Sequence, residues 1–221
     1  MKKFLVVGNP IDHSLSPALH NYWIKSNAID AIYEKQKLNE DELEQLILQV
    51  KEKKINGINV TVPFKKAIIP FLDELSFEAE STQSVNTIYL KDDKVVGHNT
   101  DIIGFETSIE KSKFNVFNKE VLILGAGGVV PSIIFALNKM KVSKIKISNR
   151  TKNKAENLRE HFKNIELTEW GEVPNVDMII NATSIGLKKE DVLKLDFSLM
   201  SGNKFFYDVI YNPNETSFLK I

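Results

Sequence analysis

The sequence predicts an α/β protein with two domains, residues 1–102 and 103–221, and a cleft between them. Short apolar runs that suit buried strands alternate with segments of helical periodicity along the whole chain. This alternation is typical of parallel sheets with helices on both faces. The length of 221 residues is enough for one large domain or two small ones. The polar stretch Lys111–Lys119 is a candidate seam between the two units.

The first half of the chain contains three predicted strands and then a hairpin. The three strands are Phe4–Val7, Ala31–Lys37 and Gly57–Val62. Proline stops the third strand, since it supplies no backbone donor for a sheet. The hairpin covers residues 87–96 and turns at the polar stretch Lys91–Lys94.

Helices are predicted between these strands. Ser16 and Pro17 indicate a helix start, with Ser16 as N-cap and a helix body that runs to Ser26. Asn39 and Glu42 have the spacing of a capping box. They open a helix with an apolar stripe that we assign to the core: Leu43, Leu46, Ile47 and Val50. Helical pattern also covers residues 66–75, and another helix begins after Asp101.

The second half repeats the alternation. Its predicted strands are Glu120–Leu124, Lys144–Ser148, Met178–Ile180 and Phe205–Val209. One helix runs from the glycine-rich segment after the first of these strands to about Met140. A second helix follows Thr151.

Composition narrows the class of protein. The 29 basic and 29 acidic residues cancel, so no overall field attracts nucleic acid or an anionic membrane. There is no cysteine, which excludes disulfides, thiol nucleophiles and cysteine metal sites and permits a reducing compartment. The apolar run at the N-terminus is too short for a signal peptide, and no stretch is long enough to span a membrane. We therefore expect a cytoplasmic protein, monomer or homodimer, without nucleic-acid or membrane partners.

No metal site is predicted. The four histidines lack the spacing of metal ligands: His13, His20, His98 and His161.

A glycine-rich turn, Gly125-Ala126-Gly127-Gly128, lies between a predicted strand and a predicted helix. Backbone amides without side chains can approach a pyrophosphate, and the helix N-terminus supplies partial positive charge. This is the context of a dinucleotide-binding, Rossmann-like domain. The match is partial because Val130 stands where the third glycine would fall, and a purely structural tight turn is the alternative interpretation.

The end of the next strand indicates which dinucleotide binds. Asn149-Arg150-Thr151 stands where a ribose-reading residue is expected, and it contains no carboxylate. An acidic residue suits the free 2′-hydroxyl of NAD, whereas arginine suits the 2′-phosphate of NADP. NADP is therefore favoured; the alternative is an N-cap Thr151 beside a surface arginine.

Polar clusters in the first half do not follow the pattern of packing residues. Ser14 and Ser16 place two hydroxyls beside a helix start, where they suit a carboxylate or serve as a plain N-cap. Asn59 and Thr61 point to the same side of a buried strand, and Lys65 follows the strand. Buried polar groups require partners, so these residues suggest a hydroxylated ligand.

Two further polar groups complete this set. Asn86 begins one strand, and Asp101 follows another in the run Asn99-Thr100-Asp101. Open α/β sheets bind ligands at the carboxyl ends of their strands, and these positions agree with that rule.

The sequence resembles the shikimate dehydrogenase family. The matching segments occur in family order over residues 14–213: Ser14-Leu15-Ser16-Pro17, Asn59-Val60-Thr61-Val62-Pro63-Phe64-Lys65, Ser84-Val85-Asn86-Thr87, Gly97-His98-Asn99-Thr100-Asp101, Gly125-Ala126-Gly127-Gly128, Asn149-Arg150-Thr151, Asn181-Ala182-Thr183-Ser184-Ile185-Gly186 and Asp208-Val209-Ile210-Tyr211-Asn212-Pro213. Each segment alone is weak, but the ordered set is strong.

The resemblance implies an NADP-dependent oxidoreductase acting on a CH–OH group. The family reduces 3-dehydroshikimate to shikimate with NADPH, in the biosynthesis of chorismate and aromatic amino acids. Residues 1–102 would be the substrate domain, with Lys65 and Asp101 as the catalytic pair. The substrate carboxylate would be held by Ser14, Ser16 and Tyr211, and the ring hydroxyls by Asn59, Thr61, Lys65, Asn86 and Asp101.

The resemblance also assigns residues 103–221 to NADP. Gly125, Ala126, Gly127 and Gly128 would contact the pyrophosphate. Asn149, Arg150 and Thr151 would hold the adenosine phosphate end, and Thr183 and Val209 would line the nicotinamide path. Whether lysine, aspartate or water donates the proton is open at this point.

One departure from the family affects these expectations. Family members continue into C-terminal helices that carry a glycine near the nicotinamide and a glutamine that bonds the substrate, whereas this sequence stops at Ile221. We expect weaker substrate binding without them. Two alternative functions stay open: a quinate/shikimate dehydrogenase of broader specificity, and a truncated, non-catalytic NADP-binding relative.

Overall fold

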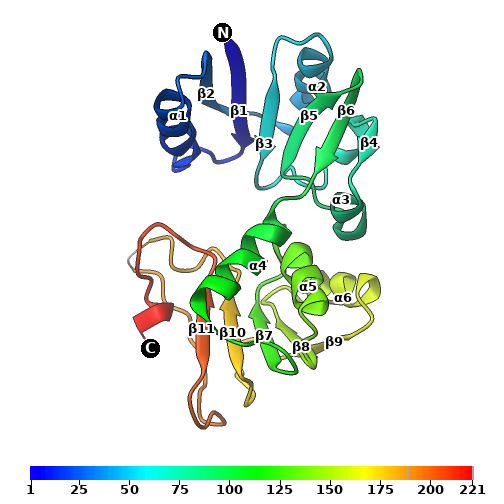
Figure 1. Cartoon of the computed structure of the whole chain (residues 1–221). Helices are drawn as coiled ribbons and strands as arrows, with labels where there is room; N and C mark the ends of the chain where they lie inside the picture. Colours follow the sequence, from blue (N-terminus) through cyan, green and yellow to red (C-terminus); the bar gives the residue numbers. More distant parts are fainter. Residues whose placement is uncertain (189, 221) are drawn as a thin grey trace. The chain divides into compact units, whose positions relative to one another are not determined.

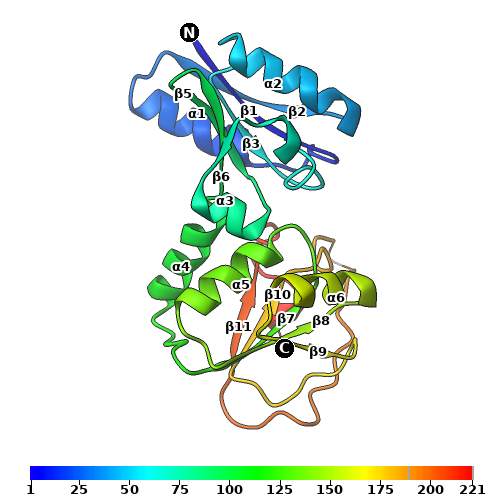
Figure 2. The ribbon, with the colours of Figure 1, turned by 90° about the vertical axis from the view of Figure 1, so that its right-hand side faces the viewer.

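The computed structural model describes residues 1–188 and 190–220. The chain divides into two compact units, Met1–Ile102 and Ile103–Ile221, and each contains its own β-sheet (Figures 1 and 2). The predicted α/β class with two sheets is confirmed. The polar stretch at residues 113–119 joins a helix to a strand within the second unit, so the units do not divide there. Within the described residues, no helix combines the length and apolarity that a bilayer crossing needs.

The first unit contains a six-stranded sheet of order β2-β1-β3-β5-β6-β4. Its strands are β1 (Lys2–Gly8), β2 (Ala31–Lys37), β3 (Gly57–Val60), β4 (Glu74–Leu75), β5 (Thr87–Lys91) and β6 (Lys94–His98). Strand β1 pairs in parallel with β2 and β3, whereas β5 is antiparallel to both β3 and β6. The sheet is therefore mixed rather than purely parallel, because the predicted hairpin supplies β5 and β6 between β3 and β4.

Helices cover both faces of this sheet. They are α1 (Ser16–Ser26), α2 (Leu43–Lys51), α3 (Phe77–Thr82) and the 3₁₀ turns η1 (Glu40–Glu42) and η2 (Ile69–Phe71). Alternate residues of β1 point to opposite faces. Leu5 and Val7 pack in the cluster that contains the α2 stripe, whereas Val6 packs with Tyr33 and Ile24 on the α1 side.

Three local predictions in this unit are corrected by the structure. Ser16 is not the N-cap: helix α1 already includes it, and its backbone N–H donates to the Ser14 hydroxyl at 3.3 Å. Strand β3 ends at Val60, two residues earlier than predicted. The segment 66–75 is not a helix but turns, η2 and the short strand β4, because Pro70 lacks the N–H that a continuous helix needs.

The second unit contains an all-parallel sheet of order β11-β10-β7-β8-β9. Its strands are β7 (Glu120–Leu124), β8 (Lys144–Ser148), β9 (Ile165–Thr168), β10 (Met178–Asn181) and β11 (Phe205–Asp208). Its helices are α4 (Asp101–Ser112), which begins in the first unit, α5 (Val130–Lys139) and α6 (Lys152–His161), with the 3₁₀ turn η3 (Phe218–Lys220). The predicted strand–helix alternation is confirmed, with β9 as an addition.

Strand β11 shows how the two faces of this sheet are covered. Tyr207 packs edge-on against Phe105 of α4, with ring centroids 5.2 Å apart. Its neighbour Phe206 points the other way and packs against Phe218 of η3 at 5.4 Å. The face of Phe206 is covered largely by residues outside regular helices: Trp170, Val173, Val176, Leu193, Phe197 and Met200. The expectation of helices on both faces is therefore wrong for this unit.

Helix α2 offers a matched test of the core. Leu46 is 1% exposed beneath the helix and Leu48 is 43% exposed on its outer side. We expect Leu46→Ala to lower the free energy of unfolding by about 2–5 kcal/mol, because it removes buried contacts and leaves a cavity. Leu48→Ala should change it by less than about 0.5 kcal/mol. Urea denaturation of both variants measures the difference, and equal effects would contradict the packing described.

Candidate functional site

The polar residues of the first unit meet at one edge of its sheet. Strands β1, β3 and β6 run in the same direction, and β5 runs the opposite way. The carboxyl ends of three strands therefore lie beside the start of β5. Six of the seven predicted substrate-binding residues of this unit follow β1, β3 or β6 or immediately precede β5: Ser14, Ser16, Thr61, Lys65, Asn86 and Asp101. Asn59, the remaining one, lies near the end of β3 itself.

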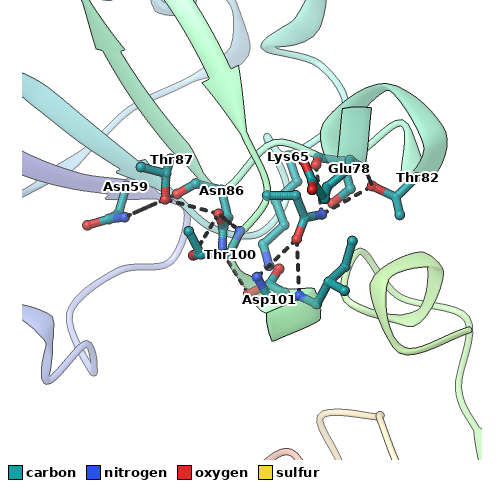
Figure 3. A network of polar contacts seen from close by, with 11 residues as sticks. Asn59, Lys65, Glu78, Thr82, Asn86, Thr87, Thr100 and Asp101 are labelled. Carbon is teal, nitrogen blue, oxygen red and sulfur yellow. Dashed lines mark hydrogen bonds and ion pairs between the residues drawn. The ribbon is translucent and has the colours of Figure 1, made fainter. Parts of the chain in front are cut away.

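The centre of this edge is an ion pair between Lys65 and Asp101. The ammonium Nζ lies 2.6 Å from the carboxylate Oδ2, and the two side chains are only 12% and 23% exposed (Figure 3). A short, charge-assisted hydrogen bond of this kind is stronger than a neutral one. It uses one of the three donors of the ammonium, so two remain for a ligand.

Asn86 holds the other oxygen of the Asp101 carboxylate. Its Nδ2 donates to Asp101 Oδ1 at 2.8 Å and to Thr100 Oγ1 at 2.9 Å. Its Oδ1 accepts from the Thr100 backbone N–H at 2.9 Å and from the Thr87 hydroxyl at 3.0 Å (Figure 3). The amide is therefore fixed in one orientation, with its nitrogen toward the carboxylate.

Asn99 holds the backbone of Asp101 through a hydrogen bond. It was not assigned a role from the sequence. It is 1% exposed. Its Oδ1 accepts from the backbone N–H of Asp101 at 2.9 Å, and its Nδ2 donates to Thr82 Oγ1 and to the Ser84 carbonyl. It thus caps the first turn of α4, whose first residue is Asp101. The position of Asn99 two residues before a predicted helix start was the available signal.

Ser16 and Asn59 are connected through Tyr33, which sequence reasoning also left out. The Tyr33 hydroxyl donates to Asn59 Oδ1 at 2.6 Å, and the tyrosine is 4% exposed. Burial raises the pKa of Tyr33 far above its ordinary value, and a hydrogen bond with Ser16 opposes the rise only partly. Tyr33 therefore stays a protonated donor at neutral pH.

Thr61 lies against Gly8, the last residue of β1. A Cβ on this glycine would lie 2.5 Å from Thr61 Cγ2 and 3.0 Å from the Val62 carbonyl oxygen. The close approach of the β1 end to Thr61 therefore requires glycine. Tyr211, the third residue expected at a carboxylate, belongs to the second unit and is 63% exposed after β11.

All predicted cofactor residues of the second unit follow adjacent parallel strands. Gly125–Gly128 follow β7, Asn149–Thr151 follow β8, Thr183 follows β10 and Val209 follows β11. Because these strands are parallel neighbours, their carboxyl ends share one edge of the sheet.

The glycine turn after β7 fits a pyrophosphate. Gly125 has φ of 109°, and a Cβ there would lie 2.8 Å from the Ala182 carbonyl oxygen, so no other residue suits this position. Gly127 and Gly128 are exposed, and a Cβ on Gly127 would meet nothing closer than 3.9 Å. The turn leads directly into α5, so open backbone and a helix N-terminus occur together.

The segment after β8 is held by its own side chains. Asn149 Nδ2 donates to the Thr151 carbonyl at 2.7 Å. Thr151 is the N-cap of α6 by position, as the alternative interpretation expected, but its side chain makes no capping hydrogen bond. Arg150 is exposed and forms no salt bridge within the described residues, which leaves its guanidinium available to a phosphate.

Asn181 fixes the ends of β10 and β11. It is fully buried, and its Nδ2 lies 3.1 Å from both Asp208 carboxylate oxygens. Its side-chain Oδ1 accepts from the Thr183 hydroxyl at 2.7 Å. Its backbone carbonyl accepts from the Val209 backbone N–H at 3.0 Å. Thr183 and Val209 are thus brought together. Across the described chain, no three His, Asp or Glu side chains are grouped as a metal site would require.

The fold and the two strand edges define a class of protein: a two-unit α/β chain with a Lys–Asp site on one sheet and a dinucleotide-type turn on the other. Comparison with family models narrows the class. Residues 6–88 match the shikimate dehydrogenase substrate binding domain, and residues 108–209 match the shikimate/quinate 5-dehydrogenase model.

Individual relatives agree with these matches. A protein of Pelagibacter ubique named shikimate dehydrogenase (NADP(+)) is 62% identical over 219 residues, which are 99% of this chain and 83% of that protein. The crystal structure of shikimate dehydrogenase from Aquifex aeolicus has a TM-score of 0.88 and 37% identity, covering 100% of this chain and 82% of that one. The Thermus thermophilus enzyme, solved with NADP(H) and shikimate, has a TM-score of 0.89 and 30% identity, covering 100% and 83%.

The chain therefore belongs to the shikimate dehydrogenase family, and the resemblance stated from its motifs is confirmed.

The stacking of His20 on Tyr33 predicts a pH dependence of stability. The rings are parallel, with centroids 4.1 Å apart, and burial lowers the pKa of His20 below its ordinary value. The unfolded chain then binds this proton more readily than the folded one, so stability is complete above about pH 6.5 and falls as pH drops below it. Urea denaturation between pH 8 and 5 should show a steeper loss for the wild type than for His20→Phe. Parallel curves would contradict the prediction.

Proposed function

We propose that this chain reduces 3-dehydroshikimate to shikimate with NADPH, as an oxidoreductase of the pathway to chorismate and the aromatic amino acids. The observation that carries the proposal is the Lys65–Asp101 pair, 2.6 Å apart at the sheet edge of a chain that belongs to this family. Every residue assigned a role comes from one chain, so a monomer or a homodimer can carry it out. We place the protein in the cytoplasm, a reducing compartment that suits a chain without cysteine.

The first unit is the proposed substrate domain. Ser14 and Ser16, with Tyr211 of the second unit, hold the substrate carboxylate. The ring hydroxyls contact the polar side chains of the β3, β5 and β6 ends: Asn59, Thr61, Lys65, Asn86 and Asp101. The threonine hydroxyl and the asparagine amides suit the ring hydroxyls of the substrate, because each of these side chains can both donate and accept hydrogen bonds.

Lys65 and Asp101 are the proposed catalytic pair. NADPH, when bound, supplies a hydride to the carbonyl carbon of the substrate. The carbonyl oxygen then gains negative charge, which the Lys65 ammonium stabilises through one of its remaining donors. A proton must also reach this oxygen to complete the new hydroxyl group. It comes from a proton donor at the Lys65–Asp101 pair: the lysine, the aspartate or a water molecule. Asp101 keeps Lys65 oriented through their ion pair.

The second unit is the proposed NADP domain. The glycine-rich turn of Gly125, Ala126, Gly127 and Gly128, which leads into the N-terminus of α5, suits the pyrophosphate. Asn149, Arg150 and Thr151 hold the adenosine phosphate end, with Arg150 on the 2′-phosphate. Thr183 and Val209, held by Asn181, line the nicotinamide side.

Removal of the lysine is the direct test of the catalytic assignment. We expect Lys65→Met to lower kcat for shikimate oxidation about 10²–10⁴-fold, because the charge that stabilises the reacting oxygen is lost. Lys66→Met is the matched control, since Lys66 is exposed next to it and should keep near-wild-type activity. The measurement is NADP⁺ reduction at saturating shikimate. Unchanged kcat in Lys65→Met would overturn the assignment.

The same assay distinguishes the alternative functions. The second unit matches a model described for both shikimate and quinate enzymes, so quinate is measured in parallel. Comparable kcat/KM values for the two substrates would make the chain a quinate/shikimate dehydrogenase. NADP⁺ binding without turnover on either substrate would identify a non-catalytic relative.

Arg150 tests the choice of dinucleotide. We expect Arg150→Ala to raise the KM for NADP⁺ about 10–100-fold, because a charge-assisted contact to the 2′-phosphate is lost. The KM for NAD⁺, which lacks that phosphate, should change little. Arg159→Ala is the control, since Arg159 is the other arginine of the chain and lies exposed on α6. Equal changes with both dinucleotides would contradict the assignment.

A further inference from the structure

The site of the first unit contains an unbroken chain of hydrogen bonds that leads to Asp101. It starts at Tyr33, whose hydroxyl donates to Asn59 Oδ1 at 2.6 Å. Asn59 Nδ2 donates to Thr87 Oγ1 at 3.1 Å, and Thr87 Oγ1 donates to Asn86 Oδ1 at 3.0 Å. Asn86 Nδ2 donates to Asp101 Oδ1 at 2.8 Å. The links from Asn59 onward are visible in Figure 3.

The direction of this chain follows from the chemistry of its members. A hydroxyl has one proton, so Thr87, which donates to Asn86, must accept from Asn59. An amide accepts at oxygen and donates at nitrogen, so each asparagine accepts from the preceding residue of the chain and donates to the next one. Every donor thus points toward the Asp101 carboxylate. Reversal of either amide would place an oxygen where the next acceptor lies.

The start of the hydrogen-bond chain, Tyr33, is held by several contacts. The backbone of Tyr33 is bound in both directions by the Asn21 side chain, at 3.0 and 2.7 Å. Its ring is stacked by His20 and is 4% exposed. Asn59 and Thr87 are opposite each other in the β3–β5 register, so backbone pairing holds the middle of the chain.

We propose that Thr87 and Tyr33 are positioning residues for the reaction: they set the amide orientation of Asn59 and Asn86, and through Asn86 the carboxylate position at which Asp101 pairs with Lys65. The proposal rests on the proposed function, because it takes Lys65 and Asp101 as the reacting pair. Thr87 contacts Asn86 directly, whereas Tyr33 acts two links further away. The effect of Thr87 on kcat therefore exceeds that of Tyr33, and Tyr33, which contacts Asn59 and Ser16, acts mainly on the KM for shikimate.

Three variants separate these roles. Thr87→Val keeps the shape of the side chain but removes both the donor to Asn86 and the acceptor for Asn59, and we expect kcat to fall about tenfold. Thr87→Ser retains the hydroxyl and should restore kcat to within about threefold of the wild type. Tyr33→Phe should raise the KM for shikimate about tenfold with a smaller change in kcat. Tyr89→Phe on β5 is the matched control, since its hydroxyl has no hydrogen-bond partner within the described residues.

Rescue by the conservative variant distinguishes positioning from loss of stability. Thr87→Ser keeps the hydroxyl that links Asn59 to Asn86, whereas Thr87→Val removes it. Thermal unfolding of each variant is measured alongside, and kcat is compared at a temperature at which every variant is fully folded. A positioning role predicts that the loss of kcat in Thr87→Val persists there, whereas a variant that is merely less stable recovers the kcat of the wild type.

A readout that does not need activity completes the design. The side-chain NH₂ resonances of Asn86, assigned by their loss in Asn86→Asp, report the orientation of its amide in the NMR spectrum. We expect them to shift or broaden in Thr87→Val and to stay in Thr87→Ser. Unchanged resonances in Thr87→Val overturn the proposal whatever the activity. Moved resonances with unchanged kcat overturn the positioning role. A wild type that turns over neither shikimate nor quinate contradicts the proposed function instead, and the NMR result alone then decides the orientation.

Discussion

The geometry of the first unit depends on a partly buried negative charge at the start of α4. The Asp101 carboxylate faces Lys65 and Asn86, and its backbone N–H is bound by Asn99. A helix N-terminus stabilises such an anion, and the ammonium balances its charge. Removing either charge alone would leave the other without its partner in a largely buried place, which is costly. The four residues are therefore coupled, although they come from three different strand ends.

The need of buried polar groups for a partner also explains where polar side chains occur in each sheet. Strand interiors are filled by apolar residues such as Leu5, Ile58 and Ile123, which need no partners. Polar groups accumulate where strands end, because backbone pairing stops there and side chains satisfy one another. Glycine marks two places where this edge is too close for a Cβ: Gly8 beside Thr61 and Gly125 beside Ala182. Both units thus combine an apolar sheet with a polar edge.

Much of this arrangement could be predicted from the sequence because its signals are local. A nearly continuous apolar run defined the strand Glu120–Leu124 with correct bounds, and the alternating Lys144–Ser148, with two buried isoleucines, was also bounded correctly. Strand β9 was missed because it is short and only Ile165 in it is buried. The proposed helix at residues 66–75 was wrong because the pattern was given more weight than Pro70.

The candidate site divides in the same way. Its polar residues were singled out because they lie at or just beyond the ends of apolar strands, whereas their partners Tyr33 and Asn99 were not. The Tyr33–Asn59 bond joins residues 26 apart in sequence, and the Asn99–Thr82 bond joins residues 17 apart. Such contacts depend on strand order and on which face of the sheet each residue occupies. The mixed order of the first sheet was not predicted, so these pairs were out of reach of sequence patterns.

A buried asparagine recurs as the link between strand ends in both units. Asn99 binds the start of α4 through its oxygen and the chain after α3 through its nitrogen. Asn181 binds Thr183 through its oxygen and Asp208 through its nitrogen. An amide can do this because it carries an acceptor and two donors on a short side chain without charge. An aspartate there would present only acceptors, and at Asn181 it would face the Asp208 carboxylate. The choice of amide over acid is thus set by the acceptors that face each nitrogen, the Ser84 carbonyl at Asn99 and the Asp208 carboxylate at Asn181, and it holds the neighbouring side chains in one orientation.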